Sequence, residues 1–356
     1  LINGHNENEI FNAFKKTLKA TRPTVISCKT KIGYGSPNKS GKAASHGSPL
    51  GEDEIKLVRK KLNWKHKEFV IPSYIFNEWR KIGNKGIKLE NVWNKNYKRK
   101  KNKIEKILKN NFNKSVKTEK INAIMEHKSL ATRKSSELII NALTKDSNNL
   151  IGGSADLAGS NNTKTKFHKV ISSNDFGGNY IHYGVREHAM CGIMNGLALH
   201  SKLIPYGGTF LIFSDYCKPS IRLSAMMKQR VIYVMTHDSI GLGEDGPTHQ
   251  PIEQLSGLRS IPNLNILRPA DRTETIECWE LALKSLKTPS ILSLTRQNLD
   301  PIRIKYSKAN KCAFGAYEIM RTNKKIKLTI FASGSEVNLA IDISHKLVKY
   351  KIYCKV

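Results

Sequence analysis

The sequence lacks the features that mark several large classes of protein. No run of residues approaches the ~20 apolar residues of a membrane-spanning helix, so we expect none of these 356 residues to cross a membrane. The six cysteines include no Cys-x-x-Cys pair, and most lie among apolar neighbours. That pattern is typical of reduced thiols in a cytoplasmic protein and argues against a disulfide framework or a zinc site.

Acidic residues are scarce, with 29 Asp and Glu against 60 Lys and Arg and a net charge of +31. Such an excess of positive charge normally suggests a nucleic-acid partner. Here the charge is mostly lysine, and it is spread along the chain with a concentration between residues 85 and 120. No zinc-finger spacing or RNA-recognition signature accompanies it, so we expect weak, salt-sensitive adsorption and no specific nucleic-acid binding.

Short apolar runs alternate with helical patterns from Leu130 to Asp300. Glu187–His200 and Thr273–Ser285 are the clearest predicted helices. The predicted strands are Leu150–Gly152, Tyr180–Tyr183, Ile204–Tyr206, Val231–Met235, Asn265–Leu267 and Ser290–Leu294. This alternation predicts an α/β fold with a mainly parallel sheet covered by helices on both faces.

The length suits more than one domain. The chain divides into the tail of an α/β unit, a basic helical linker, the domain of the predicted sheet and the start of a further α/β unit, at residues 1–52, 53–128, 129–308 and 309–356. The first part contains a predicted helix, Glu7–Leu18, and a predicted strand, Thr24–Cys28. The last contains a predicted strand, Leu328–Ala332, and a helix from Glu336. Because Leu1 is not a methionine and the last unit does not close, we expect a multi-domain fragment incomplete at both ends.

The densest group of polar and turn-forming residues lies between Thr236 and Pro251. It contains two histidines, three acidic residues, three glycines and two prolines. It follows the predicted strand Val231–Met235, and ligands bind at the carboxyl ends of strands in open α/β sheets. Imidazoles beside carboxylates can transfer protons. An ordinary solvated turn, which is the alternative, needs only a few such residues.

This loop resembles the signature loop of the transketolase family, and further blocks resemble that family in the same order. The resemblance is strong over residues 20–52 and 129–345 and weak between them. The further blocks are Thr30–Gly35, Ser45–Leu50, Ala131–Lys134, Ile151–Leu157, Tyr183–Met190, Gly207–Phe210 and Leu294–Asn298.

The resemblance implies the thiamine diphosphate-binding fold and a transferase of sugar phosphates. Such an enzyme reversibly moves a two-carbon ketol unit from a ketose phosphate to an aldose phosphate through a thiamine diphosphate ylid. The resemblance also implies a homodimer with the active site at the subunit interface, and a Mg²⁺ ion held by a Gly-Asp-Gly motif. No Gly-Asp-Gly occurs in this sequence. We therefore expect the Mg²⁺ ligands upstream of Leu1 and expect this fragment alone to be inactive.

For the cofactor, the resemblance assigns Glu187 to atom N1′ of the aminopyrimidine. There the carboxylate would favour the tautomer that removes the proton from C2 of the thiazolium. Phe210, Phe213 and Tyr216 would form an aromatic pocket around the aminopyrimidine ring. Asp156 would act nearer the thiazolium or across the interface. From the residues alone, Glu187 equally fits a helix cap, and aromatic residues at this spacing are often core.

For the substrate phosphate, the resemblance groups two arginines, a serine and a histidine, namely Arg133, Arg296, Ser160 and His237. Arginine suits this task because its planar fork binds phosphate through two hydrogen bonds. Asp245 would accept a hydrogen bond from a substrate hydroxyl, and His249 and His46 would exchange protons with substrate oxygens. Gln250 would support the loop, and His188 would be a structural neighbour of Glu187.

Other interpretations stay open. Gly192 and Gly196, four residues apart on a predicted helix, would let a second helix approach closely, either within the chain or at a dimer interface. A related thiamine diphosphate enzyme, such as deoxyxylulose-phosphate synthase or the beta subunit of a 2-oxoacid dehydrogenase, is an alternative. So is a non-catalytic dimerisation partner, although every matched catalytic position is filled.

Overall fold

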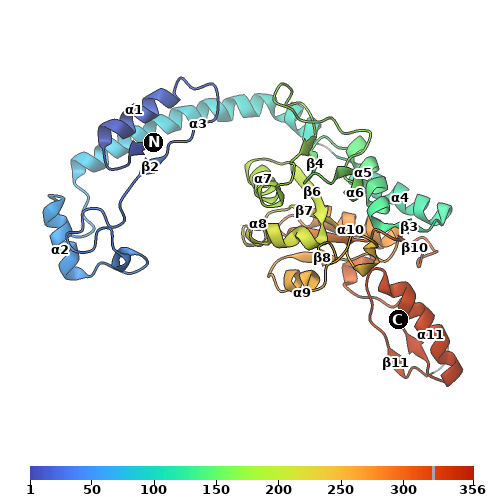
Figure 1. Ribbon diagram of the computed structural model, residues 1–356. Helices are drawn as coiled ribbons and strands as arrows, with labels where there is room; N and C mark the ends of the chain where they lie inside the picture. Colours follow the sequence, from blue (N-terminus) through green and yellow to red (C-terminus); the bar gives the residue numbers. More distant parts are fainter. Residues whose placement is uncertain (109, 323–324) are drawn as a thin grey trace. The chain divides into compact units, whose positions relative to one another are not determined.

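The computed structural model of the protein describes residues 1–108, 110–322 and 325–356. Contacts within the chain divide it into two units, Leu1–Lys98 and Arg99–Val356 (Figure 1). Within the described ranges, no helix has both the length and the apolar character that crossing a membrane requires.

The first unit contains one short strand pairing. β1, Ile2–Asn3, pairs in parallel with β2, Cys28–Lys29. The predicted strand Thr24–Cys28 is therefore wrong in extent, because only its last residue lies in a strand. The physical reason is that β1 offers just two residues as partners, so the preceding backbone has no ladder to join.

Helices make up most of the remaining first unit. α1, Glu7–Thr17, confirms the helix predicted there, and α2 spans Glu52–Lys61. The glycine-rich loop before α2 includes a short 3₁₀ turn, η1, Ala43–Ser45. α3, Ser73–Leu108, begins in this unit and lies in the predicted basic helical linker. The rings of its Trp93 and Tyr97, four residues apart, stack with centroids 5.1 Å apart.

The second unit is built on a six-stranded sheet in which every neighbouring pair is parallel. The strand order is β5-β4-β6-β7-β9-β8. The strands are β4 Leu150–Ser154, β5 Tyr180–His182, β6 Ile204–Phe210, β7 Ile232–Thr236, β8 Asn265–Leu267 and β9 Ser290–Leu294. The predicted α/β class is confirmed, and a strand lies at each of the six predicted places, although four of the strands differ from the prediction in their bounds and β6 is longer by four residues.

Strand order reverses beside β4. The chain passes from β4 to β5 on one side and then returns to β6 on the other. Crevices at such a switch point, outside the carboxyl ends of the strands, are where ligands bind in open α/β sheets. The topology therefore marks the ends of β4, β6 and β7 as the place to look for a site.

Helices cover both faces of the sheet. α4 Phe112–Glu126, α5 Thr132–Lys145 and α10 Arg272–Lys284 share one apolar cluster with the strands. The other cluster contains residues of α7, Glu187–His200, and α8, Ser214–Met226. β7 contributes side chains to both clusters, because alternate side chains of a strand point to opposite faces. Ile232 and Val234 belong to the first cluster, and Tyr233 and Met235 belong to the second.

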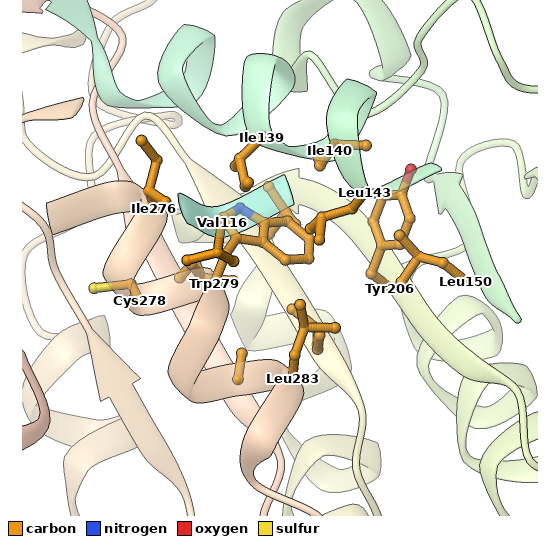
Figure 2. Packing of buried hydrophobic residues seen from close by; sticks show 14 of the residues in the cluster. Val116, Ile139, Ile140, Leu143, Leu150, Tyr206, Ile276, Cys278, Trp279 and Leu283 are labelled. Carbon is orange, nitrogen blue, oxygen red and sulfur yellow. The ribbon is translucent and has the colours of Figure 1, made fainter. Parts of the chain in front are cut away.

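Trp279 of α10 is the largest fully buried side chain of the first cluster. Figure 2 shows its ring among Val116, Ile139 and Leu143. The ring meets that of Tyr206 edge-on with centroids 5.6 Å apart, and its Nε1 donates a hydrogen bond to Ser136 Oγ at 2.8 Å. Burying the ring with its polar atom satisfied fixes how α10 and α5 pack on the sheet.

Shorter elements link these layers. They are β3 Leu130–Ala131, α6 Ala158–Asn161, η2 Leu211–Phe213, η3 Ile240–Leu242, α9 Gln254–Arg259, β10 Asn298–Leu299 and η4 Lys311–Phe314. The last part of the chain contains a further parallel pair, β11 Leu328–Thr329 with β12 Cys354–Lys355, around α11 Glu336–Leu347 and η5 Val348–Tyr350. α11 begins at the predicted residue, whereas β11 is shorter than the predicted strand.

A buried carboxylate ties α4 and α10 to the segment after the sheet. Glu277 is fully buried, and its Oε1 accepts a hydrogen bond from Lys120 Nζ at 2.8 Å. Its Oε2 accepts hydrogen bonds from Arg303 Nη1 at 2.6 Å and from the backbone nitrogen of Lys311 at 2.9 Å. Removing this charge would leave two buried cations without their partner.

We expect Glu277→Gln to lower the free energy of unfolding by about 3–5 kcal/mol, because an unpaired buried charge is costly. Denaturant unfolding measures the loss. Glu137→Gln on α5 is the matched control, since its pair with Lys134 is solvent-accessible and exposed pairs contribute about 1 kcal/mol or less. Equal effects of the two variants would contradict the importance of the buried network.

Candidate active site

A cavity of about 390 Å³ opens at the carboxyl ends of the parallel strands. All but one of its lining residues belong to the set predicted from the sequence. They are Arg133, Gly159, Ser160, Phe210, His237, Asp245, His249 and Arg296, of which Gly159 was not predicted. We call this cavity the anion pocket, for the reasons that follow.

Two arginines enter the anion pocket from opposite ends of the domain's sequence. β3 pairs antiparallel with β10. Beside this pairing, the backbone nitrogen of Thr132 donates to Thr295 Oγ1 at 3.0 Å, and that of Thr295 donates to Thr132 Oγ1 at 2.7 Å. These reciprocal bonds hold the start of α5 against the end of β9. The next residue of each segment, Arg133 and Arg296, therefore reaches the same pocket.

The two guanidinium groups are only partly neutralised. Arg133 Nη1 donates to the carbonyl oxygen of Ser160 at 2.7 Å, and Arg296 pairs with the exposed Glu244 at 3.2 Å. Burial and then the charge of Arg296 lower the pKa of Arg133, while Asp245 acts in the opposite direction. Like charges brought together in this way favour binding of an anion with several oxygens, such as a phosphate.

His237 adds a neutral ring to this positive pocket. The residue follows β7 with a φ of 60°, a left-handed conformation that costs a non-glycine residue about 1–2 kcal/mol. Its ring stacks on Phe210 with centroids 3.7 Å apart, and Nδ1 lies 2.9 Å from Thr236 Oγ1. Burial, followed by the charges of Arg133 and Arg296, lowers the pKa of His237 to about 3. The ring is therefore uncharged at neutral pH and offers a directional hydrogen bond.

The segment after β4 carries Ser160, on α6, and is anchored by a partly buried imidazole. His168 Nε2 lies 2.8 Å from Tyr206 Oη, and the backbone nitrogen of Thr165 donates to His168 Nδ1 at 2.9 Å. Burial lowers the pKa of His168 to about 4. A neutral ring with both nitrogens hydrogen-bonded holds this loop against β6.

The signature loop places His249 beside the aromatic residues. The His249 ring meets Phe213 edge-on with centroids 5.3 Å apart. Gly243 has a φ of 99°, and a Cβ there would come within 3.1 Å of Arg296 Nη1, so glycine is needed at this turn. Asp245 lies in an exposed part of the loop, whereas Asp238 is buried. The loop is thus not a simple solvated turn.

The residues predicted to contact an aromatic cofactor ring form a stack next to this pocket. Phe210 and Phe213 stack with centroids 5.7 Å apart, and Phe213 and Tyr216 at 5.9 Å. Phe210 is buried, but 65% of Tyr216 is exposed, so the stack has one open end. Flat rings with an open end suit stacking of a further aromatic ring.

Glu187 is the first residue of α7, after β5. It is 9% exposed, and within the described residues its carboxylate makes no hydrogen bond or ion pair. A nearly buried carboxylate without a partner is available for a ligand, which fits the predicted bond to a ring nitrogen. Asp156 lies after β4 with a φ of 60° and is exposed outside the anion pocket.

Two predicted residues of the second unit lie outside the anion pocket, and a third, His46, belongs to the first unit, just after η1. His188 on α7 lies near Ser220 Oγ, at 3.4 Å. Gln250 follows His249 outside the lining of the anion pocket. Among the residues described, no three His, Cys, Asp or Glu side chains gather closely enough to hold a metal ion.

Sequence reasoning missed the ion pair of Asp238 with Arg268, which are 2.7 Å apart. Asp238 was noticed only as one acid of the signature loop. Arg268 lies thirty residues away in the sequence, and no local pattern links the two. Gly159 and Glu244 were also missed, although each is next to a predicted residue: Gly159 lines the anion pocket beside Ser160, and Glu244 pairs with Arg296.

The chain matches two family descriptions. "Transketolase, thiamine diphosphate binding domain" matches residues 1–120, and "Transketolase, pyrimidine binding domain" matches residues 128–301. The chain is 44% identical to the transketolase of Cereibacter sphaeroides over 343 residues, which cover 95% of this chain and 52% of that protein. It thus spans about half the length of the relatives it matches.

Solved structures of transketolases share the fold. That of Campylobacter jejuni subsp. jejuni has a TM-score of 0.88 and 38% identity, covering 100% of this chain and 55% of that chain. A transketolase of Pichia stipitis in complex with sedoheptulose 7-phosphate has a TM-score of 0.88 and 36% identity, covering 99% of this chain and 54% of that chain.

Arg296→Gln should weaken binding of inorganic phosphate to this chain about tenfold or more, because a charge-assisted hydrogen bond contributes roughly 1.5–3 kcal/mol. Titration calorimetry measures the affinity. Arg259→Gln is the control, since Arg259 is exposed and does not line the anion pocket. Equal weakening in both variants would mean that phosphate is attracted only by the overall charge of +31.

The ring of His237 should stay neutral throughout the range from pH 5 to pH 8, where a histidine with the ordinary pKa of about 6.5 would titrate. Its pKa is depressed, so its contribution to stability is complete above the unfolded pKa and falls as the pH drops toward 3. In Arg133→Gln the pKa should rise, because a repelling charge is removed. NMR titration of the imidazole measures both values, and a wild-type midpoint near 6.5 would contradict the assignment.

Proposed function

The chain belongs to the transketolase family, and from that membership we propose that the whole protein reversibly transfers a two-carbon ketol unit from a ketose phosphate to an aldose phosphate. The observation that carries the proposal is the anion pocket. Arg133, Arg296 and the neutral His237 converge there beside the aromatic stack. A sugar phosphate held by its phosphate would extend its carbon chain toward that stack.

Thiamine diphosphate is the cofactor of this family, and residues of this chain fit the aminopyrimidine half of it. When bound, it supplies a nucleophilic carbon for carbonyl chemistry. Glu187, nearly buried and without a partner, would share a proton with the aminopyrimidine nitrogen N1′. Phe210, Phe213 and Tyr216 would stack on or around the ring and exclude water. We expect Mg²⁺ to bind the diphosphate through residues that this sequence does not contain.

The remaining side chains would orient the sugar and move protons. Arg133 and Arg296 would bind the phosphate through paired hydrogen bonds, with Ser160 and His237 adding directional ones. Asp245, exposed in the signature loop, would accept a hydrogen bond from a sugar hydroxyl and so favour one stereochemistry. His249 and His46 would exchange protons with the sugar oxygens.

We also propose that the protein is a homodimer that acts in the cytoplasm in pentose phosphate metabolism. The support for a dimer lies on α7, where a Cβ on Gly192 or Gly196 would meet no atom within 4 Å. These glycines therefore serve no close packing within the described chain. Beside them, 47% of Ile193 is exposed, and on the adjacent α8 61% of Met226 is exposed. A second copy would cover such a surface.

The alternatives have less support. Relatives that match nearly the whole chain at 42–44% identity are transketolases, which disfavours a deoxyxylulose-phosphate synthase or a 2-oxoacid dehydrogenase. A non-catalytic partner is disfavoured because every predicted residue that lines the anion pocket carries a charged, polar or aromatic side chain. Inactivity of this fragment by itself remains a prediction.

The test uses the whole protein that contains this chain, with thiamine diphosphate and Mg²⁺ present. It measures formation of sedoheptulose 7-phosphate from xylulose 5-phosphate and ribose 5-phosphate. Glu187→Gln should lower the rate about 10²–10⁴-fold, as expected for loss of a general acid–base group. Glu253→Gln, at an exposed position outside the pocket, is the matched control.

A folded, cofactor-bound protein that forms no product would contradict the proposal, and turnover with pyruvate as donor would favour a related enzyme instead. Sedimentation of the same preparation tests the homodimer, which a monomer at all concentrations would exclude.

A further inference from the structure

The conformation of His237 needs support from outside the anion pocket. Its φ of 60° lies in the left-handed region, where a non-glycine residue persists only if its surroundings hold it. The contact with Phe210 and the bond to Thr236 act on the imidazole ring. Neither fixes the backbone on the carboxyl side of His237, which continues into Asp238.

Asp238 is anchored by Arg268. Only 4% of Asp238 is exposed, and its Oδ2 accepts a hydrogen bond from Arg268 Nε at 2.7 Å. Its Oδ1 has no hydrogen-bond partner among the described residues. The bond from Arg268 is therefore the interaction that stabilises the buried carboxylate. Arg268 follows β8, and β9 lies between β8 and β7 in the sheet. The guanidinium thus reaches across a strand to hold the residue next to His237.

The start of α11 in turn fixes Arg268. Arg268 Nη1 donates to the carbonyl oxygen of Ser333 at 2.9 Å and also pairs with Glu336. The backbone nitrogen of Gly334 donates to the carbonyl oxygen of Arg268 at 3.1 Å. A Cβ on Gly334 would lie 2.8 Å from Arg268 Nε, and the φ there is 60°, so a side chain at this position would displace the guanidinium.

We propose that Arg268 is a positioning residue for the anion pocket: it holds Asp238, and through it His237, while the turn Ser333–Glu336 holds Arg268. The inference rests on the proposed function, in which His237 contacts the substrate phosphate. Neither Arg268 nor the turn lines the anion pocket. The last part of the chain therefore sets the affinity for the phosphate without touching it.

The test combines three variants of this chain with a matched control. Asp238→Asn removes the charge that Arg268 holds while keeping the shape of the side chain. Gly334→Ala adds a Cβ that would displace the guanidinium of Arg268. Glu336→Gln weakens the ion pair of Arg268 with Glu336, an exposed residue. Asp342→Asn is the control, because it removes an exposed carboxylate from the same helix, α11.

Two measurements report on the variants, and neither requires turnover. The ring protons of His237 should resonate upfield in the wild type because the ring stacks on Phe210, and Phe210→Leu verifies the assignment. Asp238→Asn and Gly334→Ala should move these signals toward the position of a free histidine and weaken binding of inorganic phosphate about tenfold. Glu336→Gln should act in the same direction with a smaller effect, and Asp342→Asn should change neither signal nor affinity.

In the full-length enzyme, Gly334→Ala should raise KM for the sugar phosphate about tenfold and change kcat less than about twofold, because uniform binding is lost. Unchanged His237 signals and phosphate affinity in folded Asp238→Asn and Gly334→Ala would overturn the inference. If transfer occurs but KM is unaltered by Gly334→Ala, the positioning role fails while the proposed function stands. If the His237 signals and affinity respond but no transfer occurs, the proposed function fails and the positioning role stands.

Discussion

Parallel pairing of six strands, of which the central ones are fully buried, is the constraint on which the rest of the second unit depends. Parallel strands put all their carboxyl ends at one edge, and helices must cover both faces because the strands have no solvated side. The residues at or just after the carboxyl ends of β4, β6, β7 and β9 consequently meet at that edge. Ser160, Phe210, His237 and Arg296 share a pocket for this reason, although they come from four separate segments of the chain.

The charges around that edge fall into two groups: those that would bind the phosphate, inside the anion pocket, and those that hold the pocket residues in place, behind it. Inside the anion pocket, Arg133 and Arg296 have few counter-charges, and the buried His237 stays neutral between them. Behind the pocket, the carboxylate of Asp238 is paired with Arg268 and so cannot neutralise the two arginines. A phosphate would therefore meet two cations and a neutral donor, in surroundings drier than water in which each hydrogen bond is stronger.

The residues proposed to bind the cofactor differ from the anion pocket in having few partners within the described chain. Glu187 and the stack from Phe210 to Tyr216 leave polar and aromatic surface unused within the described chain. The glycines of α7 likewise leave space that no described side chain fills. These features are what a site shared between two polypeptide surfaces would need, because each surface then supplies part of the contact and neither satisfies its own groups beforehand.

The sequence by itself determined the strands of the sheet, the helices α1, α7, α10 and α11, and most of the residues that line the pocket. Strands such as Ser290–Leu294 were predictable because short apolar runs bounded by turns are local signals, and the residues of the signature loop were predictable from their type and density. The two-residue strands were not, since a strand such as β2 exists only as far as its partner extends. Nor was the pairing of Asp238 with Arg268, or the approach of Gly334 to that arginine. Only the tertiary structure decided these contacts, because they join residues far apart in the chain, and local sequence carries no record of which distant side chain will neutralise a buried charge.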